Sequence, residues 1–248
     1  MQMRTDEYVK LNAVENQMWY FRALHRRMHG HLHRHLRGVV RPGVLDAGCG
    51  TGGLIEHLRA WEPGWQFTGV DLSEVACGFA QKRCPFAEFA QGSVTALPFA
   101  DNTFDAVLSS DVLCQLEAPQ ACLHESFRCL KPGGIVVVNA PAYRWLWSYH
   151  DEACQSKNRY LRREIDQYLH VAGFHRCSST YWNTLPFPLV VLKRKLLPAA
   201  PGSSDIRLLP RPLETLFNAT MALEHGWTEH VSALPYGSSI LAVGVKPA

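Results

Sequence analysis

The feature that most constrains the fold is the stretch VLDAGCGTGGLIEHL, residues 44–58, where an apolar run meets a glycine-rich turn and then a helical pattern. Similar units follow, because apolar runs alternate with helical segments from residue 44 to residue 139. Continuous apolar runs separated by helices are typical of a parallel sheet that is covered on both faces. Right-handed crossovers then make the sheet doubly wound. The sequence therefore predicts an α/β fold.

Five apolar runs are expected to form strands of this sheet: GVLDAG, WQFTGVDL, AEFAQG, TFDAVLSSD and IVVVNA. Helical patterns cover residues 6–37, with a break near Gly30, then 52–60, 73–84, 161–172 and a segment that opens at Pro119. Near the C-terminus, SSILAVGVK is expected to be a strand, and FHRCSSTYW is a second candidate. A Pro-rich, apolar and basic insertion, roughly residues 183–236, lies between these two segments.

Composition argues against several functional classes. The 25 basic and 22 acidic residues leave a net charge of +3, which is too small to indicate nucleic acid as a partner. The first residues are polar, and no segment approaches the roughly 20 apolar residues of a membrane span, so we expect a cytoplasmic protein with no integral membrane part. The eight cysteines contain no CxxC pair and are expected to be small buried hydrophobic residues in a reducing compartment.

Two acids flank the glycine turn. Asp46 stands just before the glycines, where it would repel the pyrophosphate that such turns usually bind. A ligand with ammonium and sulfonium charges and no phosphate, such as S-adenosylmethionine, would not be repelled. Asp71 ends the second strand, where the two oxygens of a carboxylate accept both hydroxyls of a ribose. Enzymes that bind nicotinamide dinucleotides share an acid like Asp71, so it is Asp46 with the glycines that favours S-adenosylmethionine.

Four segments resemble, in order, the motifs of class I S-adenosylmethionine-dependent methyltransferases, most closely the ubiquinone-biosynthesis-like and general small-molecule group. They are VLDAGCGTGG, GVDLS, GSVTALPFADNTFDAVLSSDVL and LKPGG. The resemblance implies a Rossmann-like sheet of seven strands whose last strand, here SSILAVGVK, is antiparallel. It also implies a single methyltransferase domain over 1–248, with an N-terminal helical cap (1–43), a cofactor-binding core (44–139) and a substrate side (140–248).

The resemblance further implies which residues bind the cofactor. Residues of the glycine turn would line its methionine part, Asp71 would hold the ribose, and Leu72 would pack on the adenine. The turn after the third strand would face the adenine, with Ser93 in place of the acid that the family often has. The candidate residues of the core are Asp46, Gly48, Cys49, Gly50, Asp71, Leu72, Gly92, Ser93, Val94, Ser110 and Gln115.

The segment DVLCQL resembles the family's DVLEHV but carries Cys114 and Gln115 in place of the Glu and the His. The exchange removes a possible base or metal ligand, so no metal is expected. Catalytic residues are expected after the fifth strand, because open α/β sheets bind ligands beyond the carboxyl ends of their strands. His150, with Asp151 beside it, is the candidate general base, and Tyr160 is a second candidate catalytic residue.

Several aromatic side chains follow the fifth strand and would wall an apolar or aromatic acceptor: Tyr143, Trp145, Trp147, Tyr149 and Tyr160. The alternative is that they pack this segment onto the sheet. In the N-terminal region, Trp19 and Arg22 are candidates to cap the cofactor, Arg22 by binding its carboxylate. The alternative there is that Trp19 simply belongs to the buried face of an amphipathic helix.

Five histidines at positions 25, 29, 31, 33 and 35 include pairs with the i,i+4 spacing of helical metal ligands. The break expected at Gly30, the absence of a nearby carboxylate and the interspersed arginines favour a solvated basic face instead. Within the insertion, an apolar run followed by Lys193, Arg194 and Lys195 predicts an amphipathic helix near 185–197. A lid over the substrate is favoured for this helix, with a dimer contact or a membrane contact as alternatives.

The predicted function is transfer of a methyl group from S-adenosylmethionine to oxygen or nitrogen of a small-molecule acceptor, aromatic or apolar, in small-molecule biosynthesis. One alternative is a non-catalytic module that binds the cofactor, because DVLCQL lacks two family residues. Another is a methyltransferase that acts on RNA, on protein or on a lipid-linked acceptor. No nucleic-acid partner is expected, and a homodimer is left open.

Overall fold

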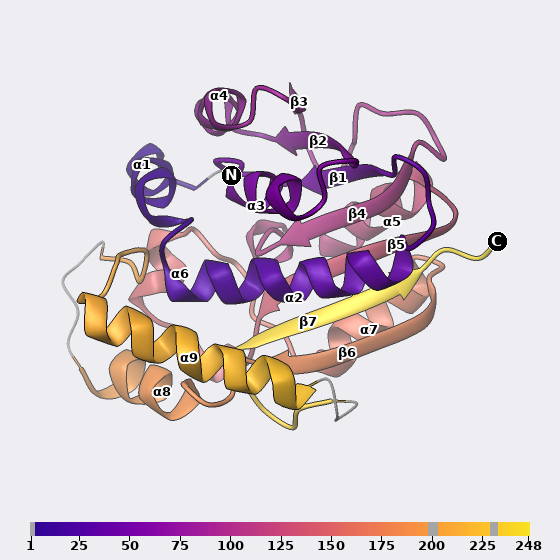
Figure 1. Ribbon diagram of the computed structural model, residues 1–248. Coiled ribbons are helices and arrows are strands. Elements are labelled where there is room, and N and C mark those ends of the chain that lie inside the picture. Colours follow the sequence, from indigo (N-terminus) through magenta and orange to yellow (C-terminus); the bar gives the residue numbers. More distant parts are fainter. Residues whose placement is uncertain (1–2, 198–202, 229–232) are drawn as a thin grey trace.

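All seven expected strands form, and they make a single sheet. The computed structural model describes residues 3–197, 203–228 and 233–248. The strands are β1 (Gly43–Ala47), β2 (Gln66–Asp71), β3 (Glu88–Gln91), β4 (Phe104–Ser110), β5 (Leu130–Pro141), β6 (His175–Trp182) and β7 (Ser239–Val245). Their order is β3-β2-β1-β4-β5-β7-β6, and β7 is antiparallel to β5 and β6 (Figure 1). The doubly wound, mostly parallel sheet with an antiparallel last strand is thus confirmed.

Nine α-helices and two short 3-10 helices surround the sheet within the described ranges. The α-helices are α1 (Thr5–Val14), α2 (Trp19–His35), α3 (Gly53–Trp61), α4 (Glu74–Arg83), α5 (Pro119–Cys129), α6 (Tyr149–Ala153), α7 (Arg162–Val171), α8 (Phe187–Leu196) and α9 (Arg211–Thr228). The 3-10 helices are η1 (Leu113–Gln115) and η2 (Arg144–Leu146). Local signals explain several ends: the Ser73 hydroxyl caps α4, and Gly173 adopts a φ of +98° just after α7.

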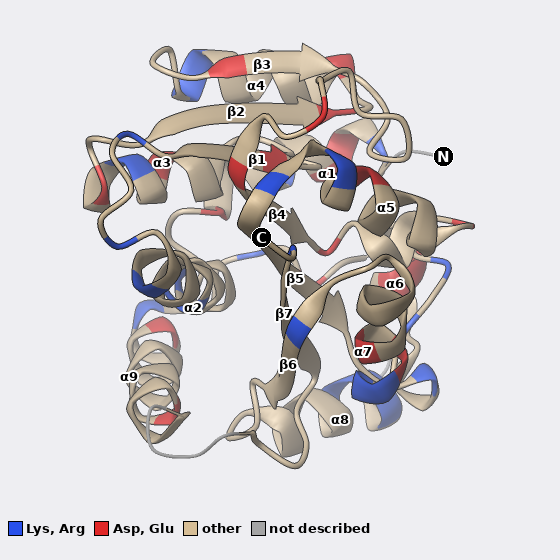
Figure 2. Ribbon diagram, turned by 90° about the vertical axis from the view of Figure 1, so that its right-hand side faces the viewer, with Lys and Arg blue, Asp and Glu red and all other residues tan. Residues whose placement is uncertain are grey.

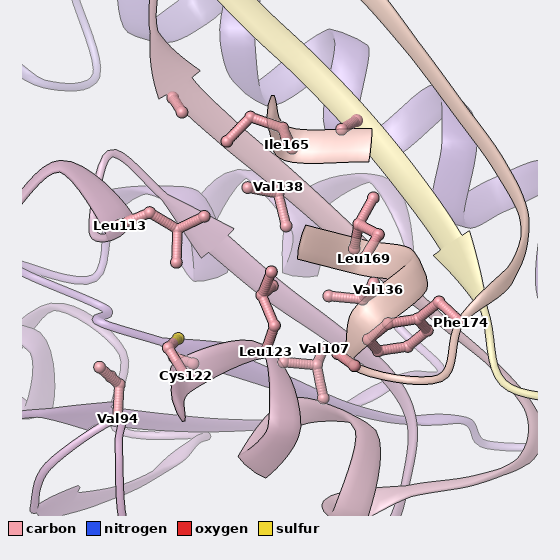
Figure 3. Packing of buried hydrophobic residues seen from close by; sticks show 14 of the residues in the cluster. Val94, Val107, Leu113, Cys122, Leu123, Val136, Val138, Ile165, Leu169 and Phe174 are labelled. Atoms are coloured by element: carbon pink, nitrogen blue, oxygen red, sulfur yellow. The ribbon is translucent and has the colours of Figure 1, made fainter. Parts of the chain in front are cut away.

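Two apolar cores lie on the two faces of the sheet, which separates the helices into layers (Figure 2). On one face, Leu123 of α5 and Leu169 of α7 pack against strand residues such as Val136 (Figure 3). On the other face, α2, α3 and α9 cover β1, β5 and β7, and Leu24 and Met28 of α2 are fully buried there. Both faces of the parallel strands are therefore removed from water, as their apolar sequences require.

The expected helix break near Gly30 is wrong. Helix α2 runs from Trp19 to His35 without interruption, and the chain breaks earlier, between α1 and α2. A helical glycine costs about 1 kcal/mol relative to alanine, whereas each fully buried leucine contributes about 1.5–3 kcal/mol. Leu24, Met28 and Leu32 are all fully buried on one face of α2. Their burial outweighs the cost of Gly30 and carries the helix through it.

The expected helix in the insertion is present as α8, and a second helix, α9, follows it. The eight cysteines are free thiols, and five of them are buried: Cys49, Cys84, Cys114, Cys122 and Cys129. In the part of the chain that the structure describes, no helix combines the length and the apolar character needed to cross a membrane.

Candidate active site

The glycine turn after β1 is fixed by contacts to two neighbouring strands. The amides of Gly48 and Cys49 donate to the carbonyl oxygen of Val70, at 2.7 and 3.0 Å, which ties the turn to β2. Gly48 has a φ of +92°, and a Cβ added there would lie 2.2 Å from Cγ2 of Val112, just beyond β4. Only glycine fits such a position. The turn therefore brings the carboxyl ends of β1, β2 and β4 together.

Asp46 is a buried acid beside this turn. It is 2% exposed, and its Oδ1 has no hydrogen-bond partner among the described residues. Burial raises the pKa of Asp46 to about 8, and the nearby acids Glu15 and Asp71 add to the shift. An unpartnered buried carboxylate is costly, and a cation beside it removes that cost. The residues present therefore fit a positively charged ligand such as S-adenosylmethionine.

Asp71 presents its carboxylate to a set of donors at the end of β2. Its Oδ2 accepts the amide hydrogen of Gly50 at 3.0 Å, and its Oδ1 accepts the amide hydrogen of Ser73 at 2.9 Å. The Tyr8 hydroxyl is the third donor, 3.3 Å from Oδ1. Burial raises the pKa of Asp71, although these hydrogen bonds act in the opposite direction. The carboxylate is thus oriented by the backbone and already accepts one hydroxyl, which is the contact expected of a ribose.

Helix α1 and Glu15, the residue after it, cover the glycine turn. The sequence indicated an N-terminal cap but not these residues. A Cβ added to Gly50 would lie 3.7 Å from Cδ2 of Leu11. Glu15, which follows α1, accepts a hydrogen bond from the Thr51 hydroxyl at 2.6 Å and pairs with Arg83 of α4 at 2.7 Å. The available signal was Glu15 itself, an acid in a helical pattern with no basic residue three or four positions away.

The residues expected around the adenine differ in exposure and in hydrogen bonding. Leu72 is 43% exposed, so its large apolar side chain can pack against a ligand. The Ser93 hydroxyl lies 2.8 Å from the Thr95 hydroxyl, and it also accepts the Thr95 amide hydrogen. Gly92 donates its amide hydrogen to Asp71 O, and Val94 is buried in the core. Ser110 and Gln115 are both half-buried, at the end of β4 and in η1.

A second polar group, missed by the sequence analysis, stands at the ends of β4 and β5. The Asp111 carboxyl accepts hydrogen bonds from the Asn139 amide at 2.9 Å and from the Tyr20 hydroxyl at 3.3 Å. Asn139 in turn accepts the indole N–H of Trp182 at 2.8 Å. Burial raises the pKa of Asp111 to about 6, against the lowering effect of these hydrogen bonds. Its position directly after β4 was the signal that could have found it.

His150 lies on α6, half-buried. Its Nδ1 accepts the Asp205 amide hydrogen at 3.2 Å, and the Cys154 thiol lies 3.6 Å from the same atom. Burial lowers the pKa of His150 to about 4, and the charge of Arg194 adds to this effect. The ring is therefore neutral at pH 7. To act as a base, Nδ1 would have to give up the hydrogen bond from the Asp205 amide and then accept the proton of the acceptor.

The residues beside His150 hold α6 in place. Asp151 forms a 2.7 Å ion pair with Arg159, both of which are 2% exposed. Tyr160 is buried, and its hydroxyl donates to the carbonyl oxygen of Leu113 at 2.8 Å. The first contact ties α6 to the segment that precedes α7, and the second ties that segment to η1.

The aromatic residues after β5 gather on the insertion. The Tyr143 ring stacks on Tyr181 of β6, with centroids 5.1 Å apart, and the rings of Tyr143 and Trp145 both contact Phe187 of α8. The Tyr149 hydroxyl donates to Asp205 at 2.8 Å, and Lys195 donates to the carbonyl oxygen of Trp147 at 3.0 Å. The cluster joins α8 to the sheet.

Trp19 and Arg22 lie on the side of α2 that faces α9. The Trp19 ring stacks on Phe217 at 4.9 Å, and its amide donates to Glu214 at 2.9 Å. Arg22 is exposed and lines a shallow cavity between α2 and α9. Tyr8, Leu11 and Glu15, rather than these two residues, cover the glycine turn in this structure.

Comparison with known proteins identifies the core. Residues 45–138 match the family model described as a methyltransferase domain. A malonyl-[acyl-carrier protein] O-methyltransferase from Enterobacter lignolyticus is 32% identical over 127 residues, which are 49% of each chain. A demethylmenaquinone methyltransferase from Renibacterium salmoninarum is 40% identical over 95 residues, 38% of this chain and 39% of the relative. The chain thus spans about half, or less, of the curated relatives it matches.

Among solved structures, phosphoethanolamine N-methyltransferase 2 of Haemonchus contortus in complex with S-adenosyl-L-methionine has a similar fold. The TM-score is 0.59 at 20% identity, over 88% of this chain and 51% of that chain. The strand order, the glycine turn with its two acids, and the match over residues 45–138 agree with one another. The core of this chain is therefore that of a class I S-adenosylmethionine-dependent methyltransferase.

Proposed function

We propose that the protein transfers the methyl group of S-adenosylmethionine to an oxygen or nitrogen atom of a small apolar acceptor. The single observation that carries the proposal is Asp46, a buried acid at the glycine turn with one oxygen that has no hydrogen-bond partner in the described part of the chain. When bound, S-adenosylmethionine supplies a methyl group already activated by its sulfonium. The protein then has to bind and orient the two reactants and to exclude water.

Each acid at the sheet edge has a separate task in this proposal. Asp46 offsets the positive charge of the cofactor, and Asp71 accepts its ribose hydroxyls, a place now held by Tyr8. The adenine packs on Leu72 and faces the turn formed by Gly92, Ser93 and Val94. Gly48, Cys49 and Gly50 allow close approach of the methionine part, with Ser110 and Gln115 beside it.

We assign the task of accepting the proton of the acceptor to Asp111. Its pKa of about 6 leaves it ionised at pH 7, and the hydrogen bonds from Asn139 and Tyr20 fix its orientation. His150 is the alternative base, and Tyr160 is a further candidate proton carrier. Both have their polar atoms engaged in this structure, by Asp205 and by Leu113.

Two observations support an apolar acceptor. The aromatic cluster of Tyr143, Trp145 and Phe187 stands beyond β5, on the side where open sheets bind ligands. The names of the two relatives give a malonyl group on an acyl-carrier protein and demethylmenaquinone as acceptors, and the second of these is largely apolar. We propose that α8 covers the acceptor as a lid.

Calorimetry with S-adenosylmethionine and its demethylated product tests the cofactor site. The wild-type protein is expected to bind both, and Asp46→Ala and Asp71→Ala are each expected to weaken binding at least tenfold. Absence of binding to the folded wild-type protein would remove the proposal. Radiolabelled cofactor with a panel of apolar alcohols, carboxylic acids, phenols and amines then tests catalysis. Tight cofactor binding with no turnover on any acceptor would instead favour the non-catalytic binding module.

A further inference from the structure

We propose that His29, His33 and Glu62 form a binding site for a divalent transition-metal ion, with Zn²⁺ as the best fit, where α2 meets the end of α3. Nε2 of His29 lies 2.8 Å from Oε1 of Glu62, and Nδ1 of His33 lies 2.6 Å from the same oxygen. The three potential ligand atoms all lie within 4.8 Å of one another. The proposal does not depend on the methyl-transfer activity.

The fold removes two reasons that the sequence gave against a metal in this segment, the helix break and the missing carboxylate, and it directs Arg26 and Arg27 towards α9. Because α2 continues through Gly30, His29 and His33 stand one turn apart on the same face of one helix. The missing carboxylate comes from Glu62, the residue directly after α3. Arg27 is paired with Glu224 of α9, and Arg26 lines the cavity on the α9 side of α2. These arginines are therefore directed away from the three ligands.

The donor set suits zinc. Two imidazoles and one carboxylate are a common set of protein ligands for Zn²⁺, with a fourth position left to water. Glu62 is partly buried, with its side chain 18% exposed, and its Oε1 already faces a nitrogen of each histidine. The side chain of His33 is 52% exposed, which leaves an open approach for the ion. The Trp61 ring packs against His29, with the centroids of the two rings 4.9 Å apart.

Metal binding requires side-chain rotations. A tetrahedral ion with ligands at about 2.0–2.1 Å holds them roughly 3.3 Å apart. The observed separations of 2.8 and 2.6 Å therefore have to widen by about half an ångström as the ion replaces the two N–H hydrogens. The rotations also have to bring the two histidine nitrogens, now within 4.8 Å of each other, to the same spacing. Each histidine then carries its proton on its other ring nitrogen. The exposed ring of His33 is free to make most of this adjustment.

An ion here would link the cap helix α2 to α3, the helix that starts at the glycine turn. Zinc would thereby stabilise the contact between α2 and the core. The same contact holds a histidine pair, the buried His25 and the half-buried His57, whose Nδ1 atoms are 2.7 Å apart. Zinc binding is therefore expected to raise the thermal midpoint of the protein by mass action.

The test uses the full chain without a histidine tag, after treatment with a chelator. Zn²⁺ binding is measured by calorimetry, and the Co²⁺ complex by its visible absorption. The expected result is one ion per chain, a tetrahedral Co²⁺ spectrum and a raised thermal midpoint. Glu62→Gln and His33→Ala should each weaken Zn²⁺ binding at least tenfold and abolish the Co²⁺ spectrum. The matched control is His124→Ala, an exposed histidine of α5 on the opposite face of the sheet, which should bind as the wild type does.

Far-UV circular dichroism establishes that each variant is folded, so that a loss of binding reports on the site. The proposal is overturned if the wild-type protein binds no Zn²⁺. It is equally overturned if folded Glu62→Gln and His33→Ala bind the ion as tightly as the wild type, since binding would then lie elsewhere. Weak binding of several ions per chain, unaffected by either variant, would also count against the site.

Discussion

The Tyr8 hydroxyl lies 3.3 Å from Oδ1 of Asp71, so a side chain of the N-terminal helix makes the contact that a ribose hydroxyl is proposed to make. The two residues are 63 positions apart in the chain. Tyr8 is 6% exposed and Asp71 is 7% exposed, so α1 shields this acid from solvent. For a ribose to bind Asp71, the Tyr8 hydroxyl therefore has to leave the carboxylate or share it with the ribose. Because Tyr8 is part of α1, we expect α1 to shift when the ligand enters.

Replacement of Tyr8 by phenylalanine should strengthen cofactor binding. The variant keeps the ring but removes the hydroxyl that competes for Oδ1 of Asp71. A hydrogen bond to a charged group contributes roughly 1.5–3 kcal/mol, part of which water replaces, so an increase in affinity of about three- to tenfold is expected. Isothermal calorimetry with the demethylated product measures it. Weaker binding by Tyr8→Phe would show that the hydroxyl holds the ligand rather than competes with it.

Cofactor binding should release a proton. With a pKa of about 8, Asp46 is mostly protonated at pH 7, and a cation beside it lowers that pKa. Release of up to about 0.9 proton per cofactor is expected at pH 7. Calorimetry in buffers of different ionisation enthalpy measures the number. Asp46→Asn, tested at cofactor concentrations that saturate its weaker site, should release none, and equal release by both proteins would exclude Asp46 as the source.

The same carboxyl should make the ligand-free protein less stable as the pH rises. Its pKa is higher in the folded state than its ordinary value of 3.8, so the folded protein holds this proton more tightly. Its contribution to stability is fully present below about pH 4 and is lost as the pH rises through about 8. Asp46→Asn should therefore gain on the order of 1–3 kcal/mol over the wild type between pH 5 and pH 9. Urea unfolding at the two pH values measures this, with the exposed Asp101→Asn as the control that should not change.

The pH dependence of turnover should identify the base. If Asp111 accepts the proton, kcat/KM should rise with pH through about 6, because the carboxyl is protonated and inactive below that value. With a pKa of about 4, His150 would give a flat profile from pH 5 upward. Asp111→Asn should lower kcat about 10²–10⁴-fold and remove the acid limb, whereas His150→Gln should keep the limb. An acid limb that persists in Asp111→Asn would transfer the role to another group.

The ion pair of Asp151 and Arg159 should matter for stability rather than for cofactor affinity. Both side chains are buried, so Arg159→Met leaves an unpaired carboxylate in the interior and should cost about 3–5 kcal/mol. The matched control is Arg144→Met, which breaks a more exposed pair with Glu164 and should cost less than about 1 kcal/mol. Urea unfolding compares the two. Equal losses would show that burial does not govern the Asp151 pair.

Local patterns were enough for the central sheet. The runs around Leu45, Val70 and Val137 are apolar because both faces of the parallel strands are covered, and that requirement is visible in the sequence itself. Ser73, Pro119 and Gly173 mark helix ends through their own side chains or backbone preferences. The same local logic misplaced the break in the N-terminal helices, since the cost of Gly30 is local but the burial that outweighs it is not.

The sequence by itself therefore determined the strands along the chain, the helices between the first five of them, the glycine turn and the two acids that flank it. Each of these rests on neighbouring residues and on periodicity. Only the tertiary structure decided what meets across that framework. It brought Tyr8 onto Asp71, Tyr20 onto Asp111, and Glu62 onto the histidines of α2. These contacts depend on how whole helices pack on the sheet. No local sequence pattern predicts which side chains will meet when they are tens of residues apart in the chain.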